Sequence, residues 1–151
     1  MAFQIVPMTA GHLDQAEAVE KTCFPEDPWS RQILEEALNG ENAAAWAAVE
    51  EGALLGYVFF SRVLDEGSVD NIAVLPAARR RGAASALLEA AHRWGQERGV
   101  RIFFLEVRAS NGGAAALYQK MGYQEAGRRR NYYLSPREDA IIMKLELMPC
   151  T

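Results

Sequence analysis

Asn71-Ile72-Ala73-Val74-Leu75-Pro76-Ala77-Ala78-Arg79-Arg80-Arg81-Gly82-Ala83-Ala84 is the most informative stretch of the sequence. It predicts, in order, a buried strand, a turn at the proline, a basic loop and the start of a helix. The first backbone N–H groups of a helix lack partners within it and carry partial positive charge, so they form a candidate anion site. The pattern R-x-x-G-x-A matches neither GxxxxGK[ST] nor GxGxxG, and therefore excludes the two commonest nucleotide-binding loops.

Length and composition indicate one globular domain. The chain has 151 residues, of which 50% are hydrophobic and 24% charged. We expect one domain over residues 1–147 and a short C-terminal tail, residues 148–151. The longest apolar runs are about seven residues, against the ~20 that a membrane-spanning helix needs. No export signal opens the chain, and Cys23 and Cys150 are too few and too far apart for a disulfide framework. The cytoplasm is therefore the expected location.

Charge is divided unevenly along the sequence. Residues 1–75 contain 3 basic and 13 acidic side chains, whereas residues 76–151 contain 13 basic and 7 acidic ones. This asymmetry suggests two differently charged partners on one domain, although two solvated faces would give the same pattern.

The N-terminal half is predicted to contain two helices and four strands. Thr9 is placed to cap a helix in which apolar residues recur every three or four positions, and Ser30 is placed to cap the second. A loop with two prolines, residues 24–29, joins these helices. The strands are expected at residues 3–6, 44–49, 54–62 and 68–74.

The C-terminal half continues the alternation of strands and helices. Five apolar residues form one stripe on the helix after the basic loop, namely Ala84, Leu87, Leu88, Ala91 and Trp94. A strand at residues 101–108, a helix from Asn111 to about residue 121, and strands at residues 123–133 and 140–147 follow. The strand–helix–strand crossover requires a parallel pair. The expected class is α/β: a single mixed, mostly antiparallel sheet with a central parallel strand pair and flanking helices.

Glu106 is a candidate general base. It lies in Ile102-Phe103-Phe104-Leu105-Glu106-Val107, a strand that is apolar on both faces. Desolvation there is expected to raise its pKa and to suit it to accept a proton near neutral pH. The alternative is a structural glutamate that reaches solvent or pairs with Arg108.

Tyr118 and Asn111 are further candidates. Tyr118 lies on the apolar stripe of its helix, and its phenol, with a pKa near 10, is a proton donor at pH 7. Taken alone, the position favours the alternative, a core tyrosine whose hydroxyl bonds a carbonyl. Asn111 is placed to cap the same helix, and that role does not exclude contact with a ligand.

Several of these segments resemble the GNAT N-acetyltransferase superfamily. The resemblance rests on Leu105-Glu106-Val107-Arg108-Ala109-Ser110-Asn111, on Ala116-Leu117-Tyr118 and Met121-Gly122-Tyr123, and on the R-x-x-G-x-A loop. Within the superfamily, Asn71–Val74, Arg129-Arg130-Asn131-Tyr132-Tyr133 and Arg137–Met143 are similar to the RimI-type bacterial ribosomal protein alanine N-acetyltransferases.

The resemblance implies an enzyme that moves an acetyl group from acetyl-CoA to the N-terminal alanine of a small-subunit ribosomal protein. It implies Glu106 as base and Tyr118 as acid. It implies pairing of the pantetheine arm with the backbone of Ile72, Ala73 and Val74, and contact of Asn111 with the cofactor. The implied pyrophosphate loop is Arg79, Arg80, Arg81, Gly82, Ala83, Ala84 and Ser85. Ala84, where many relatives have glycine, and the helix-weakening pair Gly112-Gly113 depart from the pattern.

The chemistry agrees with this reading. An α-amino group titrates near 7.7–8.0, so part of it is already neutral at pH 7, whereas a lysine near 10.4 is not. Direct transfer in a ternary complex is expected, with an amide near Val74 holding the carbonyl oxygen and no metal. The acidic loop residues Glu26 and Asp27, with Trp29 and Tyr132, are candidates for binding a basic protein N-terminus. The enzyme is expected to be a monomer with no direct contact to nucleic acid or membrane.

Three alternatives remain at this point. Cysteine catalysis by Cys23 or Cys150 would need an adjacent base, and neither His12 nor His92 is placed for it. A nucleic-acid-binding module would use residues 79–81 and 128–130 with Tyr132 and Tyr133. An acetyltransferase for a small amine or a lysine side chain would share the cofactor half and differ in the acceptor half.

Overall fold

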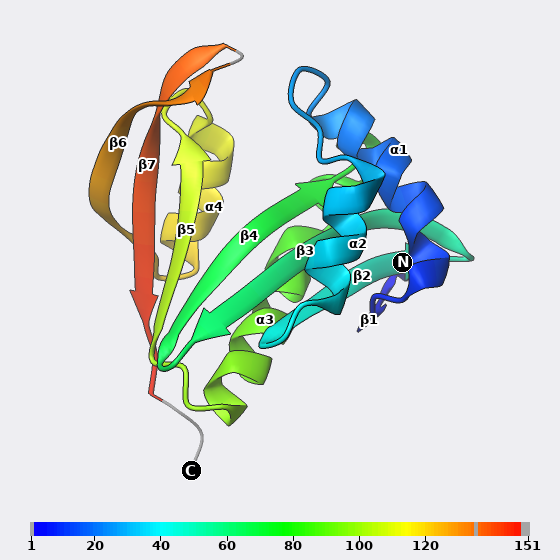
Figure 1. Cartoon of the computed structure of the whole chain (residues 1–151), viewed down its shortest axis with the longest axis horizontal. Coiled ribbons are helices and arrows are strands. Elements are labelled where there is room, and N and C mark those ends of the chain that lie inside the picture. The colour runs from blue at the N-terminus through cyan, green and yellow to red at the C-terminus, as the bar shows by residue number, and fades with distance from the viewer. Residues whose placement is uncertain (1, 135, 149–151) are drawn as a thin grey trace.

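The computed structural model describes residues 2–134 and 136–148 as a single mixed sheet with helices on both faces (Figure 1). The sheet has seven strands in the order β1-β2-β3-β4-β5-β7-β6. The strands are β1 Gln4–Pro7, β2 Ala43–Glu50, β3 Ala53–Val63, β4 Glu66–Val74, β5 Ile102–Arg108, β6 Gln124–Leu134 and β7 Arg137–Glu146. The helices are α1 Leu13–Cys23, α2 Arg31–Asn39, α3 Ala83–Glu97 and α4 Gly112–Lys120. The predicted α/β class is confirmed.

Strands β4 and β5 form the parallel pair that the crossover through α3 predicts. They pair only over Glu66–Ser68 and Ile102–Phe104, whereas the other neighbours in the sheet are antiparallel. Beyond Ser68 and Phe104 the two strands separate, and Figure 1 shows them diverging toward their carboxyl ends. This divergence opens the middle of the sheet.

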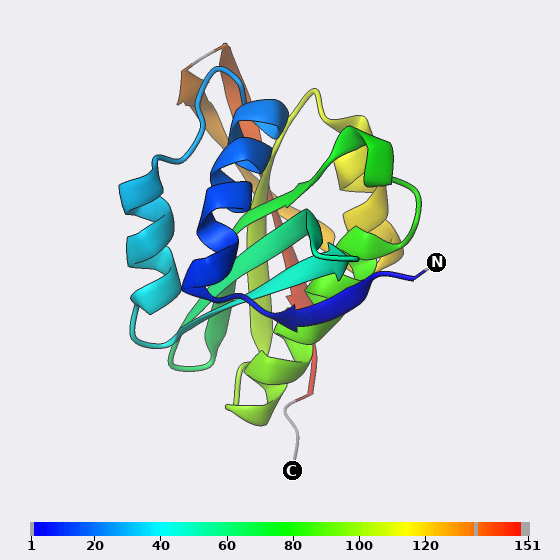
Figure 2. The ribbon, with the colours of Figure 1, turned by 90° about the vertical axis from the view of Figure 1, so that its right-hand side faces the viewer.

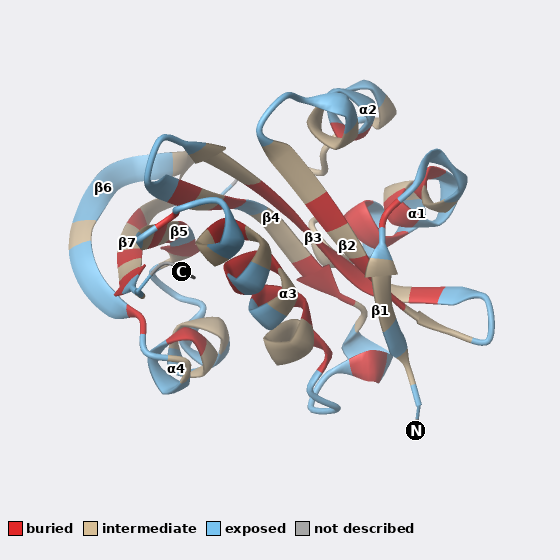
Figure 3. Cartoon of the chain, turned by 90° about the horizontal axis from the view of Figure 1, so that it is seen from below, coloured by how far each residue is buried: buried red, intermediate tan, exposed pale blue. Residues whose placement is uncertain are grey.

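The helices cover the two faces of the sheet in pairs. Helices α1 and α2 lie over one face, and α3 and α4 over the other (Figures 2 and 3). Each face has its own apolar core. One is built around Leu87, Leu88 and Phe103 under α3, and the other around Leu13, Leu34 and Phe59 under α1 and α2. The edge strand β6 is mostly exposed (Figure 3).

Helix α3 forms where its sequence predicts. Leu87, Leu88 and Ala91 are fully buried against the sheet. The helix starts after Gly82, which adopts the left-handed conformation at φ +85°. A side chain at this position would meet no atom within 4 Å, so the backbone conformation and not the available space favours glycine here.

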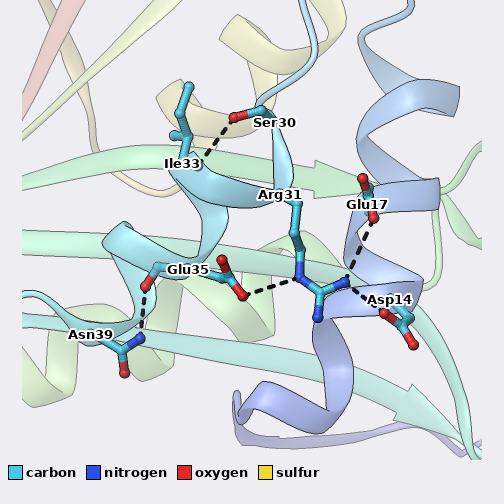
Figure 4. A network of polar contacts seen from close by, with 7 residues as sticks. All are labelled: Asp14, Glu17, Ser30, Arg31, Ile33, Glu35 and Asn39. Atoms are coloured by element: carbon cyan, nitrogen blue, oxygen red, sulfur yellow. Dashed lines mark hydrogen bonds and ion pairs between the residues drawn. The ribbon is translucent and has the colours of Figure 1, made fainter.

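Helices α1 and α2 are joined by a surface network centred on Arg31 (Figure 4). Its guanidinium lies 2.6 Å from the Asp14 carboxylate and 3.7 Å from Glu17, both on α1, and 3.6 Å from Glu35 on α2. Ser30 caps α2 by accepting a hydrogen bond from the Ile33 N–H at 3.2 Å, as its position predicts.

Some boundaries differ from the sequence-based expectations. Residues 10–12 form a short 3-10 turn, in which the Thr9 N–H donates to His12 Nδ1, and α1 begins only at Leu13. Strand β7 begins at Arg137, three residues before the expected start, because its pairing with β6 continues to the hairpin. Ser135 and most of the predicted tail lie outside the described residues. None of the described helices has the length and apolar character needed to cross a bilayer.

Candidate active site

Two cavities meet where β4 and β5 separate. The first, of about 440 Å³, lies toward α1 and has five carboxylate residues in its wall: Glu20, Glu26, Asp27, Asp70 and Glu106. The second, of about 980 Å³, lies between β4, α3 and α4 and is lined by Arg79, Arg80 and Lys120. We call them the acidic cavity and the basic cavity. Their shared wall consists of Cys23, Phe24, Ile72, Asn111 and Tyr118.

The basic cavity contains the N-terminus of α3. Gly82, Ala83, Ala84 and Ser85 all line it. The first intrahelical bond in this turn runs from the Ala86 N–H to the Gly82 carbonyl, so the preceding amides have no partner within the helix. Together with the helix dipole and the neighbouring arginine residues, they form a site for an anionic group.

The three arginines of the loop do not all line the basic cavity. Arg80 lines the basic cavity, and Arg79 lines it while donating from Nε to the Val74 carbonyl at 3.1 Å. Arg81 instead forms a two-pronged contact with Glu50 on β2, at 2.7 and 3.2 Å, and is not part of the cavity wall. The structure therefore brings Arg79 and Arg80 to the predicted anion site and turns Arg81 away from it.

Strand β4 supplies a wall that an extended ligand can use. Ile72, Ala73 and Val74 line the basic cavity. Because the β4–β5 pairing ends at Ser68, this part of β4 has no strand neighbour on its β5 side within the described residues. Its backbone groups there can pair with an extended chain in the manner of an added strand.

Glu106 lies at the opening between the two strands, in the wall of the acidic cavity. Its Oε2 is 2.7 Å from Arg129 Nε on β6, and 31% of its side chain is exposed. The expected desolvation is therefore wrong: the separation of the strands leaves the carboxylate open on one side. Arg108, the alternative partner, lies 3.3 Å from Glu138 and over the ring of Tyr133.

Tyr118 is buried in the shared wall with 7% of its surface exposed. Burial is the main cause that raises the pKa of its phenol to about 12, and the neighbouring Tyr133 adds to this. Asn111 caps α4, as its sequence position predicts, by accepting from the Ala114 N–H at 3.1 Å, and it also lines both cavities.

The loop between α1 and α2, residues 24–30, closes the acidic cavity and is called here the acceptor loop. Glu26, Asp27 and Trp29 all line the cavity, and the Trp29 ring packs on Phe59 at 5.5 Å between centroids. Tyr132 is 48% exposed and does not line either cavity, although the Glu106 carboxylate raises its pKa. Its neighbour Tyr133 lines the acidic cavity instead.

Sequence reasoning missed several residues of the acidic cavity. Glu20 is a carboxylate on the apolar stripe of α1, seven residues after Leu13 and four after Ala16, and that position is a signal in itself. Asp70 sits at an irregularity in β4, where Phe59 pairs with Asn71 and Phe60 with Val69, so Asp70 is skipped in the strand register with β3. A bulge of this kind cannot be read from the alternation of side chains.

Cys23 and the arginine clusters are engaged in ways that do not favour the alternative functions. The Cys23 thiol donates to the Val74 carbonyl at 3.5 Å, and burial raises its pKa, so the thiolate form is disfavoured. Cys150 lies outside the described residues. Arg81 and Arg129 each pair with a carboxylate at 2.7 Å, and Arg128 lies 3.5 Å from Glu125. Across the described residues, no cluster of His, Cys, Asp or Glu is arranged to hold a metal ion.

Comparison with known proteins agrees with this geometry. Residues 13–123 match the acetyltransferase (GNAT) family. The chain is 42% identical over 122 residues to the [ribosomal protein bS18]-alanine N-acetyltransferase of Escherichia coli strain K12, covering 80% of this chain and 82% of that one. The crystal structure of the E. coli ribosomal-protein-S18-alanine N-acetyltransferase superposes with a TM-score of 0.89 at 36% identity, covering 99% and 97% of the two chains. A more distant structure, Arabidopsis thaliana NAA60 in complex with acetyl-CoA, has the same fold, with a TM-score of 0.87 at 21% identity and coverage of 97% and 99%. The chain belongs to the GNAT acetyltransferase family.

Proposed function

We propose that this enzyme transfers the acetyl group of acetyl-CoA to the α-amino group of an N-terminal alanine on a small-subunit ribosomal protein. The observation that carries the proposal is the meeting of a basic and an acidic cavity at one wall that holds Tyr118, with Glu106 in the acidic cavity beside it. A polyanionic donor fits the basic cavity, and a basic protein N-terminus fits the acidic cavity. The similarity to the bS18-alanine N-acetyltransferases supports this acceptor, and a ribosomal-protein acceptor favours a cytoplasmic location.

In this proposal the donor lies along β4. Its pyrophosphate binds the free amides at the start of α3, with Arg79 and Arg80 beside it. The pantetheine arm pairs with the backbone of Ile72–Val74, and Asn111 contacts it from the opposite wall. This delivers the thioester to the point where the two cavities join. The donor is a cosubstrate, and no metal takes part in the proposed steps.

The acceptor amine enters through the acidic cavity. Glu106 takes its proton, directly or through one water molecule. The ion pair with Arg129 does not prevent this, because both side chains are partly exposed, at 31% and 59%, and such pairs contribute less than about 1 kcal/mol. An incoming ammonium group therefore competes with Arg129 for the same carboxylate.

Tyr118 supplies a proton to the departing sulfur. With a pKa of about 12, its phenol stays protonated throughout the neutral range. The burial that raises this pKa also destabilises a thiolate formed in the same place, so proton transfer is favoured as the C–S bond breaks. The acetyl group passes directly to the amine, because the Cys23 thiol is held protonated and bonded to the Val74 carbonyl.

The proposal is tested by incubating the enzyme with acetyl-CoA and three basic peptides of one sequence. One begins with a free alanine, one with an N-formylated alanine, and one with a formylated alanine and an added lysine. Mass spectrometry is expected to show acetylation of the first peptide only. Acetylation of the lysine-containing blocked peptide, or of a polyamine in preference to the alanine peptide, would contradict the proposed acceptor. Salt-dependent RNA retention without acetyl-CoA binding would contradict the enzyme assignment altogether.

A further inference from the structure

Glu20 is the most deeply buried carboxylate of the acidic cavity, and neither the proposed proton transfer nor the donor site uses it. Only 1% of its surface is exposed. We propose that Glu20 is a positioning residue that holds the acceptor loop against the donor-binding strand β4, and that it thereby sets the affinity for the acceptor. This inference rests on the proposed function and adds a residue that determines acceptor binding.

The contacts of Glu20 reach three different elements. Its Oε1 accepts a hydrogen bond from the backbone N–H of Trp29 in the acceptor loop at 2.7 Å. Its Oε2 accepts from Asn71 Nδ2 on β4 at 2.6 Å and from the Tyr57 hydroxyl on β3. One side chain on α1 thus connects the acceptor loop, β4 and β3 through hydrogen bonds.

All three of these partners are neutral donors. A buried carboxylate is costly unless its oxygen atoms are hydrogen-bonded, and each contact to a charged acceptor is stronger than one between neutral groups. The carboxylate also raises the pKa of Tyr57, after burial as the largest cause, so the phenol remains a donor. Removing Glu20 would leave the Trp29 N–H and the Asn71 amide without this acceptor, and would release the loop at its inner end.

The position of Glu20 relates it to acceptor binding more than to donor binding. Its contact at Trp29 lies two residues after Asp27, which lines the acidic cavity together with Glu26. Glu20 itself lines the acidic cavity and not the basic one. A further contact at the end of the loop is the Arg31 network (Figure 4), whose charged side chains are partly or largely exposed and line neither cavity. Arg31 is therefore a matched control, because it connects the end of the loop to α1 without contributing to the cavity wall.

The test compares the full-length Glu20→Ala, Glu20→Gln and Arg31→Met variants by steady-state kinetics with an alanine-initiated basic peptide. For Glu20→Ala we expect KM for the peptide to rise about tenfold or more, whereas KM for acetyl-CoA and kcat at saturating peptide change less than about twofold. Glu20→Gln is expected to recover most of the affinity, because its amide oxygen can accept from the Trp29 N–H and Asn71 can rotate to pair with the new amide. Arg31→Met is expected to leave both KM values unchanged.

Hydrogen exchange gives a second readout that does not depend on activity. In Glu20→Ala, the segment that contains residues 24–30 is expected to exchange faster than in the wild type, while the peptides from α3 keep their protection. If Glu20→Ala does not fold, Tyr57→Phe and Asn71→Ala each remove one donor and are expected to give smaller effects in the same direction. An unchanged peptide KM in folded Glu20→Ala, or equal increases of both KM values, would overturn the inference. Failure of the wild type to acetylate any alanine peptide would instead contradict the proposed function, and the exchange result would still report on the loop.

Discussion

Replacing Gly56 by alanine tests whether the donor lies along β4. Gly56 is a buried residue of β3 that pairs with Val74. An added Cβ would lie 2.5 Å from the Ala73 carbonyl oxygen and 3.0 Å from Val74 Cα. Both of these atoms are backbone atoms of the strand that we propose to bind the pantetheine arm, so no side-chain rotation can relieve the contact.

The size of the displacement follows from these distances. Ordinary contact begins at 3.4 Å, and 3.4 − 2.5 gives 0.9 Å as the movement that β4 or β3 must make at this point. A displacement of about 1 Å in a positioning element can reduce catalytic efficiency by about 10²-fold. Overpacking of this kind also costs about 1–3 kcal/mol of stability. We therefore expect catalytic efficiency to fall by roughly 10- to 100-fold, together with weaker binding of CoA and a lower Tm.

Gly67→Ala is the matched control, because Gly67 lies in β4 itself but at the end where β4 still pairs with β5. There an added Cβ would meet the ring of Phe60 and not the backbone near the donor site. Isothermal titration calorimetry with CoA, at a temperature where all three proteins are folded, gives the comparison. We expect Gly67→Ala to lose stability and keep its affinity for CoA. Equal CoA affinities for Gly56→Ala and the wild type would refute the placement of the donor on β4.

Three further predictions concern proton transfer and pH. Glu106→Gln is expected to lower kcat by roughly 10²-fold or more in a discontinuous acetylation assay, whereas its CoA affinity, measured by calorimetry, is expected to change little. Normal turnover at pH 7 would contradict the assignment of Glu106 as the base. Tyr118→Phe is expected to lower kcat. Because the pKa of Tyr118 is about 12, the kcat of the wild type is expected not to fall between pH 8 and 10. A fall in kcat near pH 10 would contradict the role of Tyr118 as the acid. Burial lowers the pKa of His92 from 6.5 to about 4 in the folded protein. As the pH falls from 6.5 to 4, His92 is therefore protonated in the unfolded chain but still neutral in the folded one, and the protein loses stability. The loss reaches about 3 kcal/mol. In urea unfolding at pH 7 and pH 4, His92→Gln is expected to show less acid destabilisation than the wild type, and an identical loss would contradict the assignment.

The architecture follows largely from local sequence signals. The apolar stripe of α3 and the conformational demand at Gly82 identify the helix and its start, and the crossover then requires a parallel pair. The separation of β4 from β5 after Ser68 and Phe104 could not be predicted. It depends on how far two strands stay in register once they are packed between helices, which is a property of the whole sheet.

Some residues of the candidate site could be named from the sequence, but their contacts could not. Glu106 was expected to be desolvated because its own strand is apolar, yet its environment is set by the diverging β4 and by Arg129 on β6. The role of Glu20 depends on Tyr57 and Asn71, which lie 37 and 51 residues further along the chain. Arg81 follows Arg80 directly, but the two face different surroundings because Arg80 adopts a left-handed backbone conformation at φ +66°. Contacts of this kind arise only when distant elements pack together.

The central claim is that donor and acceptor approach each other from the two cavities and react beside Glu106 and Tyr118. A crystal structure with a bisubstrate conjugate, CoA joined to an alanine-initiated basic peptide, tests it most directly. We predict the pyrophosphate at the amides of residues 82–85, the peptide in the acidic cavity, and the acetylated nitrogen within about 3 Å of Glu106 or of one bridging water. Phosphates bound away from the start of α3, or a peptide that leaves Glu106 paired with Arg129 and facing bulk solvent, would contradict the claim.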